Sequence, residues 1–181
     1  MPESLYILIA ITPALCYLCW SEWKIRKLPN RWTVTMMVVS LVLRLICGGW
    51  RMMADGALAG LLGGLILLIP YLMRGAGGGD LKMLTGVCCA LGTRRLLPML
   101  FLMSWIGLIL AIVLLCTKVM NHRYLKHYFL CLFWWKYDRK EGRKSLPKRW
   151  RRDAWMPFGL AIAGGAWATL ILDIILGGLP L

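Results

Sequence analysis

Acidic side chains are scarce in this chain. Its 181 residues include 8 Asp and Glu against 22 Lys and Arg, so the formal net charge is +14. Histidine is scarcer still, with 2 residues, and no carboxylate lies at ligand spacing from either of them. Metal sites in proteins need several His, Cys or carboxylate ligands at defined spacings. The scarcity of these ligands argues against a catalytic metal centre.

The 7 cysteines do not form a recognisable framework either. Their number is odd and six of them lie inside apolar runs, whereas disulfide-stabilised domains place even sets of cysteines in loops. Cys16 and Cys19 form a CxxC pair, but a structural zinc site needs a second pair of ligands, which the sequence lacks. We predict no metal and no disulfide framework.

Apolar residues dominate the chain, because 60% of it is hydrophobic. A helix needs roughly 17 to 25 apolar residues to cross a bilayer. Five runs are of this length, and a sixth, shorter run lies at 81–92; the five long ones cover 5–21, 33–50, 56–73, 96–117 and 156–178. The segment before the first run has no basic residue, unlike a cleavable signal peptide. We predict an all-α, multi-pass membrane protein of about six transmembrane helices, forming one domain over 1–181.

The distribution of charge predicts the orientation of these helices. Short cytoplasmic loops collect Lys and Arg, and the segment 118–153 is the most basic in the chain. If the short run 81–92 did not cross the membrane, this loop would lie outside. We therefore expect six crossings in a bacterial inner membrane, with both termini periplasmic.

Two acids then fall at the same cytoplasmic surface. Glu22 follows the first apolar run, and Asp80 lies in the glycine-rich stretch "RGAGGGDLKML" at the start of the fourth. Two neighbouring carboxyl groups can share a proton, so that one activates water while the other polarises a carbonyl. This chemistry requires no cofactor. The alternative is structural: Asp80 as the N-cap of a helix and Glu22 as an interfacial acid beside basic residues.

Three segments in this order resemble the type IV prepilin peptidases, a family of intramembrane GxGD aspartyl proteases. They are "EWKIRKLPN", "GGGDLKML" and "WMPFGLAIAGG". The residues that match the family pattern are Glu22, Leu28–Pro29–Asn30, Gly77, Gly79, Asp80, Lys82 and Pro157–Phe158–Gly159.

The resemblance implies the GxGD aspartyl protease fold and removal of the basic leader from prepilin or pseudopilin precursors at the cytoplasmic membrane face. Glu22 and Asp80 are the expected catalytic acids, and Gly77, Gly79 and Lys82 the expected substrate-binding residues. The chain departs from the family in carrying glutamate where aspartate is usual. It also lacks the paired CxxC region of the bifunctional members, so N-methyltransferase activity is not supported.

Other interpretations stay open at this point. The loop 118–153 interleaves bases with aromatic residues, a mixture suited to anionic lipid headgroups, and no nucleic-acid-binding motif accompanies it. A catalytically inactive homologue could act as a membrane scaffold or assembly factor of a pilus or secretion system. A proton-linked transporter ranks last, because transporters place ionisable groups near the bilayer midplane.

Overall fold

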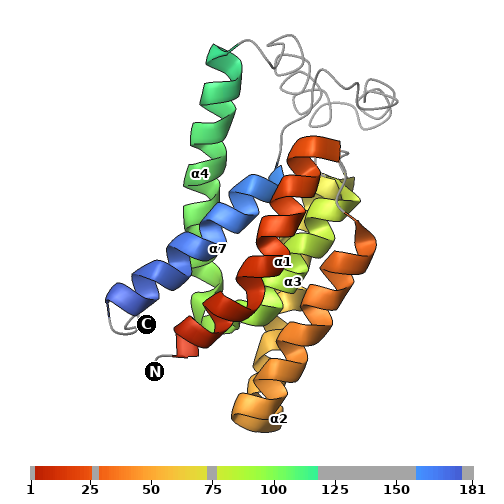
Figure 1. Ribbon diagram of the computed structural model, residues 1–181, viewed down its shortest axis with the longest axis vertical. Helices are drawn as coiled ribbons and strands as arrows, with labels where there is room; N and C mark the ends of the chain where they lie inside the picture. Colours follow the sequence, from red (N-terminus) through yellow and green to blue (C-terminus); the bar gives the residue numbers. More distant parts are fainter. Residues whose placement is uncertain (1–2, 26–28, 73–76, 118–157, 177–181) are drawn as a thin grey trace, which may run out of the picture. The chain divides into compact units, whose positions relative to one another are not determined.

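A computed structural model describes residues 3–25, 29–72, 77–117 and 158–176 (Figure 1). All regular structure in these ranges is helical: α1 (Glu3–Ile25), α2 (Asn30–Leu72), α3 (Gly78–Leu91), the 3-10 helix η1 (Thr93–Arg95), α4 (Leu96–Cys116) and α7 (Phe158–Ile175). The chain divides into two compact units, Met1–Gly107 with Pro157–Leu181, and Leu108–Met156. The predicted basic loop 118–153 lies outside the described residues, and a single domain over 1–181 stays a prediction.

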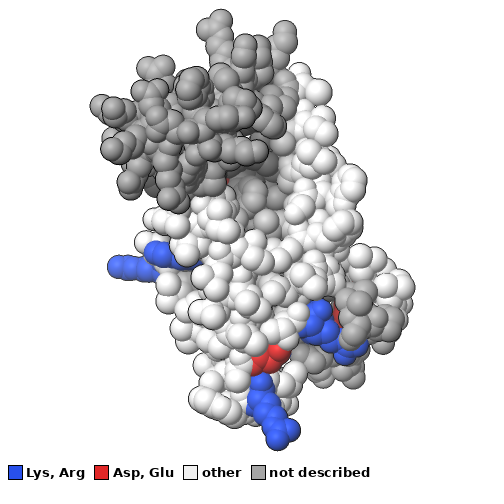
Figure 2. Space-filling model, turned by 180° about the vertical axis from the view of Figure 1, so that it is seen from behind, with Lys and Arg blue, Asp and Glu red and all other residues white. Residues whose placement is uncertain are grey.

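Four helices in the described ranges are long and apolar enough to cross a membrane, by length and composition: Leu5–Ile25, Asn30–Leu72, Thr93–Leu114 and Phe158–Ile175. Where Figure 2 shows described residues, the surface is mostly uncharged and the charged side chains lie in small groups. The predicted class, an all-helical membrane protein, is therefore confirmed.

Helix α2 reverses direction at Gly49. This residue has φ 69° and ψ −166°, a backbone conformation that glycine adopts without the steric penalty of a Cβ. In an uninterrupted helix, Arg44 and Asp55 would lie about 16 Å apart along the axis, yet their side chains form an ion pair at 2.6 Å. The predicted helices 33–50 and 56–73 are thus the two arms of a hairpin (Figure 1). We call residues 30–48 the first arm and residues 50–72 the second arm.

The short helix α3 packs against both arms of α2. On one side, a Cβ at Gly86 would lie 3.5 Å from the Thr33 carbonyl oxygen in the first arm. On the other side, a Cβ at Gly56 would lie 2.7 Å from the Cys89 carbonyl oxygen, and one at Gly60 would lie 3.2 Å from that of Thr85. Backbones approach this closely only where side chains are absent. Glycines therefore let the hairpin enclose α3 along its length.

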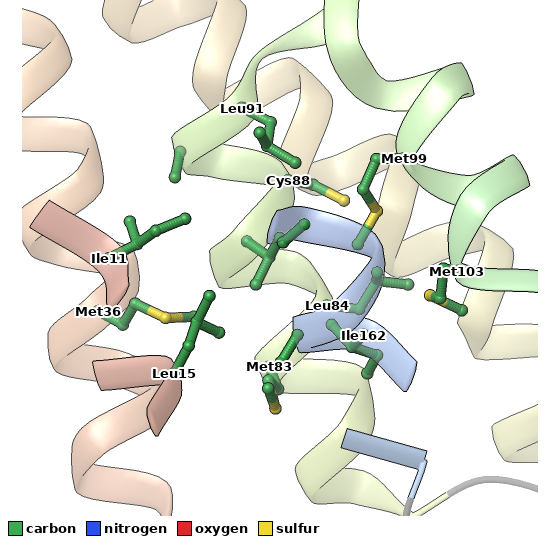
Figure 3. Packing of buried hydrophobic residues seen from close by; sticks show 14 of the residues in the cluster. Ile11, Leu15, Met36, Met83, Leu84, Cys88, Leu91, Met99, Met103 and Ile162 are labelled. Carbon is green, nitrogen blue, oxygen red and sulfur yellow. The ribbon is translucent and has the colours of Figure 1, made fainter. Parts of the chain in front are cut away.

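The apolar core joins α3 to the remaining helices. Figure 3 shows the side chains of Leu15, Met83, Met99 and Ile162 meeting between α1, α3, α4 and α7. All four are fully buried. Helices α1, α3 and α7 contact one another pairwise, and this packing brings the end of α1 next to the first turns of α3 and α7.

Candidate active site

Glu22 lies one turn before the C-terminus of α1 and is 3% exposed. Its Oε1 accepts a hydrogen bond from the amide of Gly159 at 3.2 Å. Its Oε2 is buried and has no hydrogen-bond partner among the described residues. Burying a charged or polar atom without a partner is costly. The fold therefore keeps the second oxygen of this carboxyl group buried at a cost to stability.

Asp80 is the third residue of α3, where free backbone amides gather at the helix start. Its Oδ2 accepts a hydrogen bond from the Gly77 amide at 3.0 Å, the arrangement by which a third-position acid reaches back to the N-cap. Asp80 is thus not the N-cap itself, because Gly77 occupies that position with an extended backbone. Among the described residues no hydrogen bond reaches its Oδ1.

The structure places the two predicted acids at the same end of the helix bundle, because Gly159 of α7 adjoins both Glu22 and Met83, one turn along α3 from Asp80. Glu22 and Asp80 come from different helices, yet their carboxyl groups are close enough to interact electrostatically. Within the described parts of the chain, neither forms an ion pair. Each uses one oxygen to accept from a backbone amide and leaves the other available. Two such groups can share one proton and bracket a water molecule.

The predicted substrate-binding residues fall around this pair. Gly77 contacts the Asp80 carboxylate, and a Cβ there would lie 3.0 Å from Oδ2. Gly79 is in the first turn of α3. The Lys82 side chain is exposed, and its Nζ donates to Asn30 Oδ1 at 3.0 Å. Lys82 therefore ties the first turn of α3 to the first residue of α2, and a contact with substrate stays a prediction.

Aromatic side chains lie on α1 and α2 near the same end. The rings of Tyr17 and Trp32 are 4.5 Å apart, and the Lys24 ammonium lies 4.9 Å from the centre of the Trp20 ring. Trp and Tyr are enriched where helices meet the membrane–water interface. The position of these side chains is consistent with the prediction that the end of α1 lies at the membrane interface.

The described residues include no group of three or more His, Cys, Asp or Glu that could hold a metal ion. The chemistry available to the site from these residues is that of its two carboxyl groups. Backbone amides at the starts of α3 and α7 supply the fixed hydrogen-bond donors.

Comparison with protein-family models matches residues 9–112 to the type IV leader peptidase family. The matched segment is more than half of the chain and includes both acids and the glycine-rich loop. The chain belongs to the type IV leader peptidase family. Membership supports a peptidase function of this general type. Comparisons with curated proteins and with solved structures found no match.

Sequence reasoning missed two residues of the leader peptidase site. Gly159 donates to Glu22 from 137 residues away, and Asn30 accepts from Lys82 from 52 residues away. Both lie in the short segments "PFG" and "LPN", which carried the resemblance without indicating a role. Spacing could not reveal these contacts, because only the packing of four helices sets them.

Proposed function

We propose that this protein is a membrane aspartyl endopeptidase that removes the basic leader peptide from type IV prepilin or pseudopilin precursors. Glu22 and Asp80 are the catalytic acids. The observation that carries the proposal is the meeting of two carboxyl groups without basic partners among the described residues, one of them buried with an unpartnered oxygen. Membership of the leader peptidase family supports the substrate class.

The reaction follows from the geometry of a shared-proton pair. One carboxylate removes a proton from water as the water oxygen bonds to the scissile carbonyl carbon. The other, protonated, carboxyl group gives its proton to the carbonyl oxygen. When the C–N bond breaks, the first acid gives the proton that it took from water to the leaving nitrogen, and the second acid takes a proton back from a hydroxyl of the tetrahedral intermediate, so that the carbonyl re-forms as a carboxylic acid. Both carboxyl groups end the cycle sharing one proton again.

The helices provide for six crossings of the membrane. Helix α2 has 43 residues, a length of about 65 Å that is roughly twice the hydrocarbon thickness, and it reverses at Gly49. Helix α3 is only about 21 Å long, but both arms of α2 shield it. With α1, α4 and α7 each crossing once, the N-terminus is periplasmic and the two acids face the cytoplasm. A periplasm-dependent reporter enzyme should be active when fused after Gly92 and inactive when fused after Thr117.

Replacing Asp80 by Asn tests the catalytic assignment. Leader removal from a co-expressed precursor with a basic leader should fall by about 10²- to 10⁴-fold, the usual contribution of a positioned acid or base. Glu3→Gln, an acid-to-amide change at the far end of α1, is the control and should process normally. Undiminished cleavage by Asp80→Asn would end the proposal. Absence of cleavage by the unaltered protein, with pilus or secretion assembly depending on it, would favour an inactive scaffold.

A further inference from the structure

The first turn of α7 meets the carboxyl group of Glu22. Helix α7 begins at Phe158, so the amides that follow have no partner within the helix. The Gly159 amide donates to Glu22 Oε1 at 3.2 Å, and the Leu160 amide also interacts with this carboxyl group. The positive end of a helix favours a negatively charged group at this position. Glu22 therefore acts as a cap for α7, supplied by another helix.

The absence of a side chain at position 159 makes this contact possible. A Cβ on Gly159 would collide with Glu22 Oε2 and would lie 3.1 Å from Glu22 Cδ. It would also lie 3.2 Å from Met83 Sδ, one turn along α3 from Asp80. Gly159 is buried at the point where α1, α3 and α7 converge. The backbone of α7 consequently forms one wall of the space that the Glu22 carboxyl group occupies.

The same glycine lies beside both oxygens of the carboxyl group. Oε1 is held by the Gly159 amide, and Oε2 accepts no hydrogen bond within the described ranges. Asp80 is the acid that interacts electrostatically with this group. Gly159 thus faces both oxygens of Glu22: its amide donates to Oε1, and its Cα lies beside Oε2.

We propose that Gly159 is a positioning residue whose bare backbone is matched to the Glu22 carboxyl group. The proposal rests on the proposed function, because it concerns how one acid of the pair is aimed. Glutamate is longer than aspartate by one C–C bond, about 1.5 Å. In this chain the bare backbone at Gly159 makes room for the longer side chain and binds its outer oxygen.

Single and double substitutions test the match between the two positions. Gly159→Ala should lower kcat for leader cleavage by about 100-fold, as expected for a catalytic group displaced by about 1 Å, with little change in KM. Adding Glu22→Asp withdraws the carboxyl group from the new methyl group. The double variant should therefore recover at least about tenfold in kcat over Gly159→Ala alone. If the loss of kcat in the double variant equals the product of the losses in the two single variants, the proposal is overturned.

Folding is measured on the same four proteins, since Gly159→Ala can also destabilise the helix bundle. The melting temperature in detergent should fall in Gly159→Ala and return in the double variant, because the collision is with Glu22. If neither kcat nor melting temperature recovers, Gly159 and Glu22 are not matched. Gly164→Ala is the control in the same helix: its Cβ would lie 3.3 Å from the flexible side chain of Ile106, so kcat should stay near that of the unaltered enzyme.

Parallel measurement of Asp80→Asn separates this proposal from the function itself. If Asp80→Asn is inactive and the Gly159 and Glu22 losses multiply, only the matching is wrong. If Asp80→Asn cleaves normally, the catalytic pair is wrong, and the melting temperatures still report whether the two positions contact each other as described.

Discussion

The charged side chains near the two ends of α3 have different kinds of partner. At its C-terminal end, Arg44 is 7% exposed, pairs with Asp55 at 2.6 Å and donates to the Ala90 carbonyl oxygen at 3.1 Å. Nearby, Arg95 pairs with Asp173 at 2.8 Å. We call this group the arginine end. Every acid there has a guanidinium partner, so the cost of removing the charges from water is largely offset.

At the other end, which we call the acid end, Glu22 and Asp80 accept hydrogen bonds only from backbone amides among the described residues. Lys82, the lysine of the glycine-rich stretch, donates a hydrogen bond to Asn30 and not to either acid. Folding alone would be better served by neutral residues at this position. The comparison teaches that the acids at the arginine end have guanidinium partners, whereas the acid end holds two carboxyl groups without such partners among the described residues, as the proposed function requires.

The largest expected effect comes from neutralising the acid end. Glu22→Gln should lower kcat by about 10²- to 10⁴-fold, because the amide cannot exchange a proton. The glutamine oxygen still accepts from the Gly159 amide, so the free energy of unfolding should change by less than about 1 kcal/mol. Leader cleavage and denaturant unfolding in detergent are the two measurements. An active variant, or one that loses activity only because it unfolds, would remove the distinction between the two ends.

Disrupting the ion pair at the arginine end should lower stability and leave cleavage unchanged. Arg44→Met leaves the Asp55 carboxylate without its guanidinium partner, but Asp55 is 35% exposed and still accepts from Thr93, so the free energy of unfolding should fall by about 1–3 kcal/mol. Cleavage per folded molecule should stay near that of the unaltered enzyme, because the change lies at the far end of α3. Adding Asp55→Asn removes the uncompensated charge and should restore part of the stability. A loss of kcat in correctly folded Arg44→Met would contradict the assignment of catalysis to the acid end alone.

A smaller effect is expected at the hydrogen bond between Lys82 and Asn30. Lys82→Met and Asn30→Leu should each lower cleavage by roughly tenfold, the equivalent of one hydrogen bond of about 1.4 kcal/mol. Because both changes break the same bond, the double variant should be no worse than either single one. Independent, multiplying losses would instead assign Lys82 a direct contact with the substrate.

The smallest effect is expected at the outer rim of the acid end. Lys24→Met removes the contact of the ammonium with the exposed Trp20 ring, which is 4.9 Å away and is worth about 0.5–1 kcal/mol at exposed sites. Stability should fall by no more than this, and kcat should not change. A large loss of kcat would extend the catalytic surface from Glu22 to the next turn of α1.

Much of the fold could be predicted from apolar runs, because lipid requires each crossing segment to satisfy its own backbone as a helix. The predicted run 81–92 became α3 at Gly78–Leu91, and the runs on either side of Gly49 became one hairpin. The exact reversal at Gly49 could not be read from the sequence, since the neighbouring Gly48 offers the same freedom. The arms are fixed by Arg44 contacting Asp55 and the carbonyl of Met52, which is a tertiary contact.

The candidate site, too, was only partly predictable from the sequence. Glu22 and Asp80 were recognisable because acids are rare and each lies at the end of an apolar run. The positions of these runs predicted that both acids lie at the same depth in the membrane. Their orientation was not predictable, because it depends on the amides of Gly77 and Gly159. Whether Lys82 would face the acids or Asn30 was equally open, since an exposed lysine has many rotamers and only its neighbours select among them.

By itself, then, the sequence determined that the chain is a helical membrane protein, because the apolar runs and scarce charges leave the chain few other ways to satisfy its backbone in lipid. It also predicted that two acids lie at one interface. Only the tertiary structure decided which atoms meet. The glycines of α2, α3 and α7 allow backbones to approach within contact distance, and this close packing aims one oxygen of each acid at a backbone amide and leaves the other free.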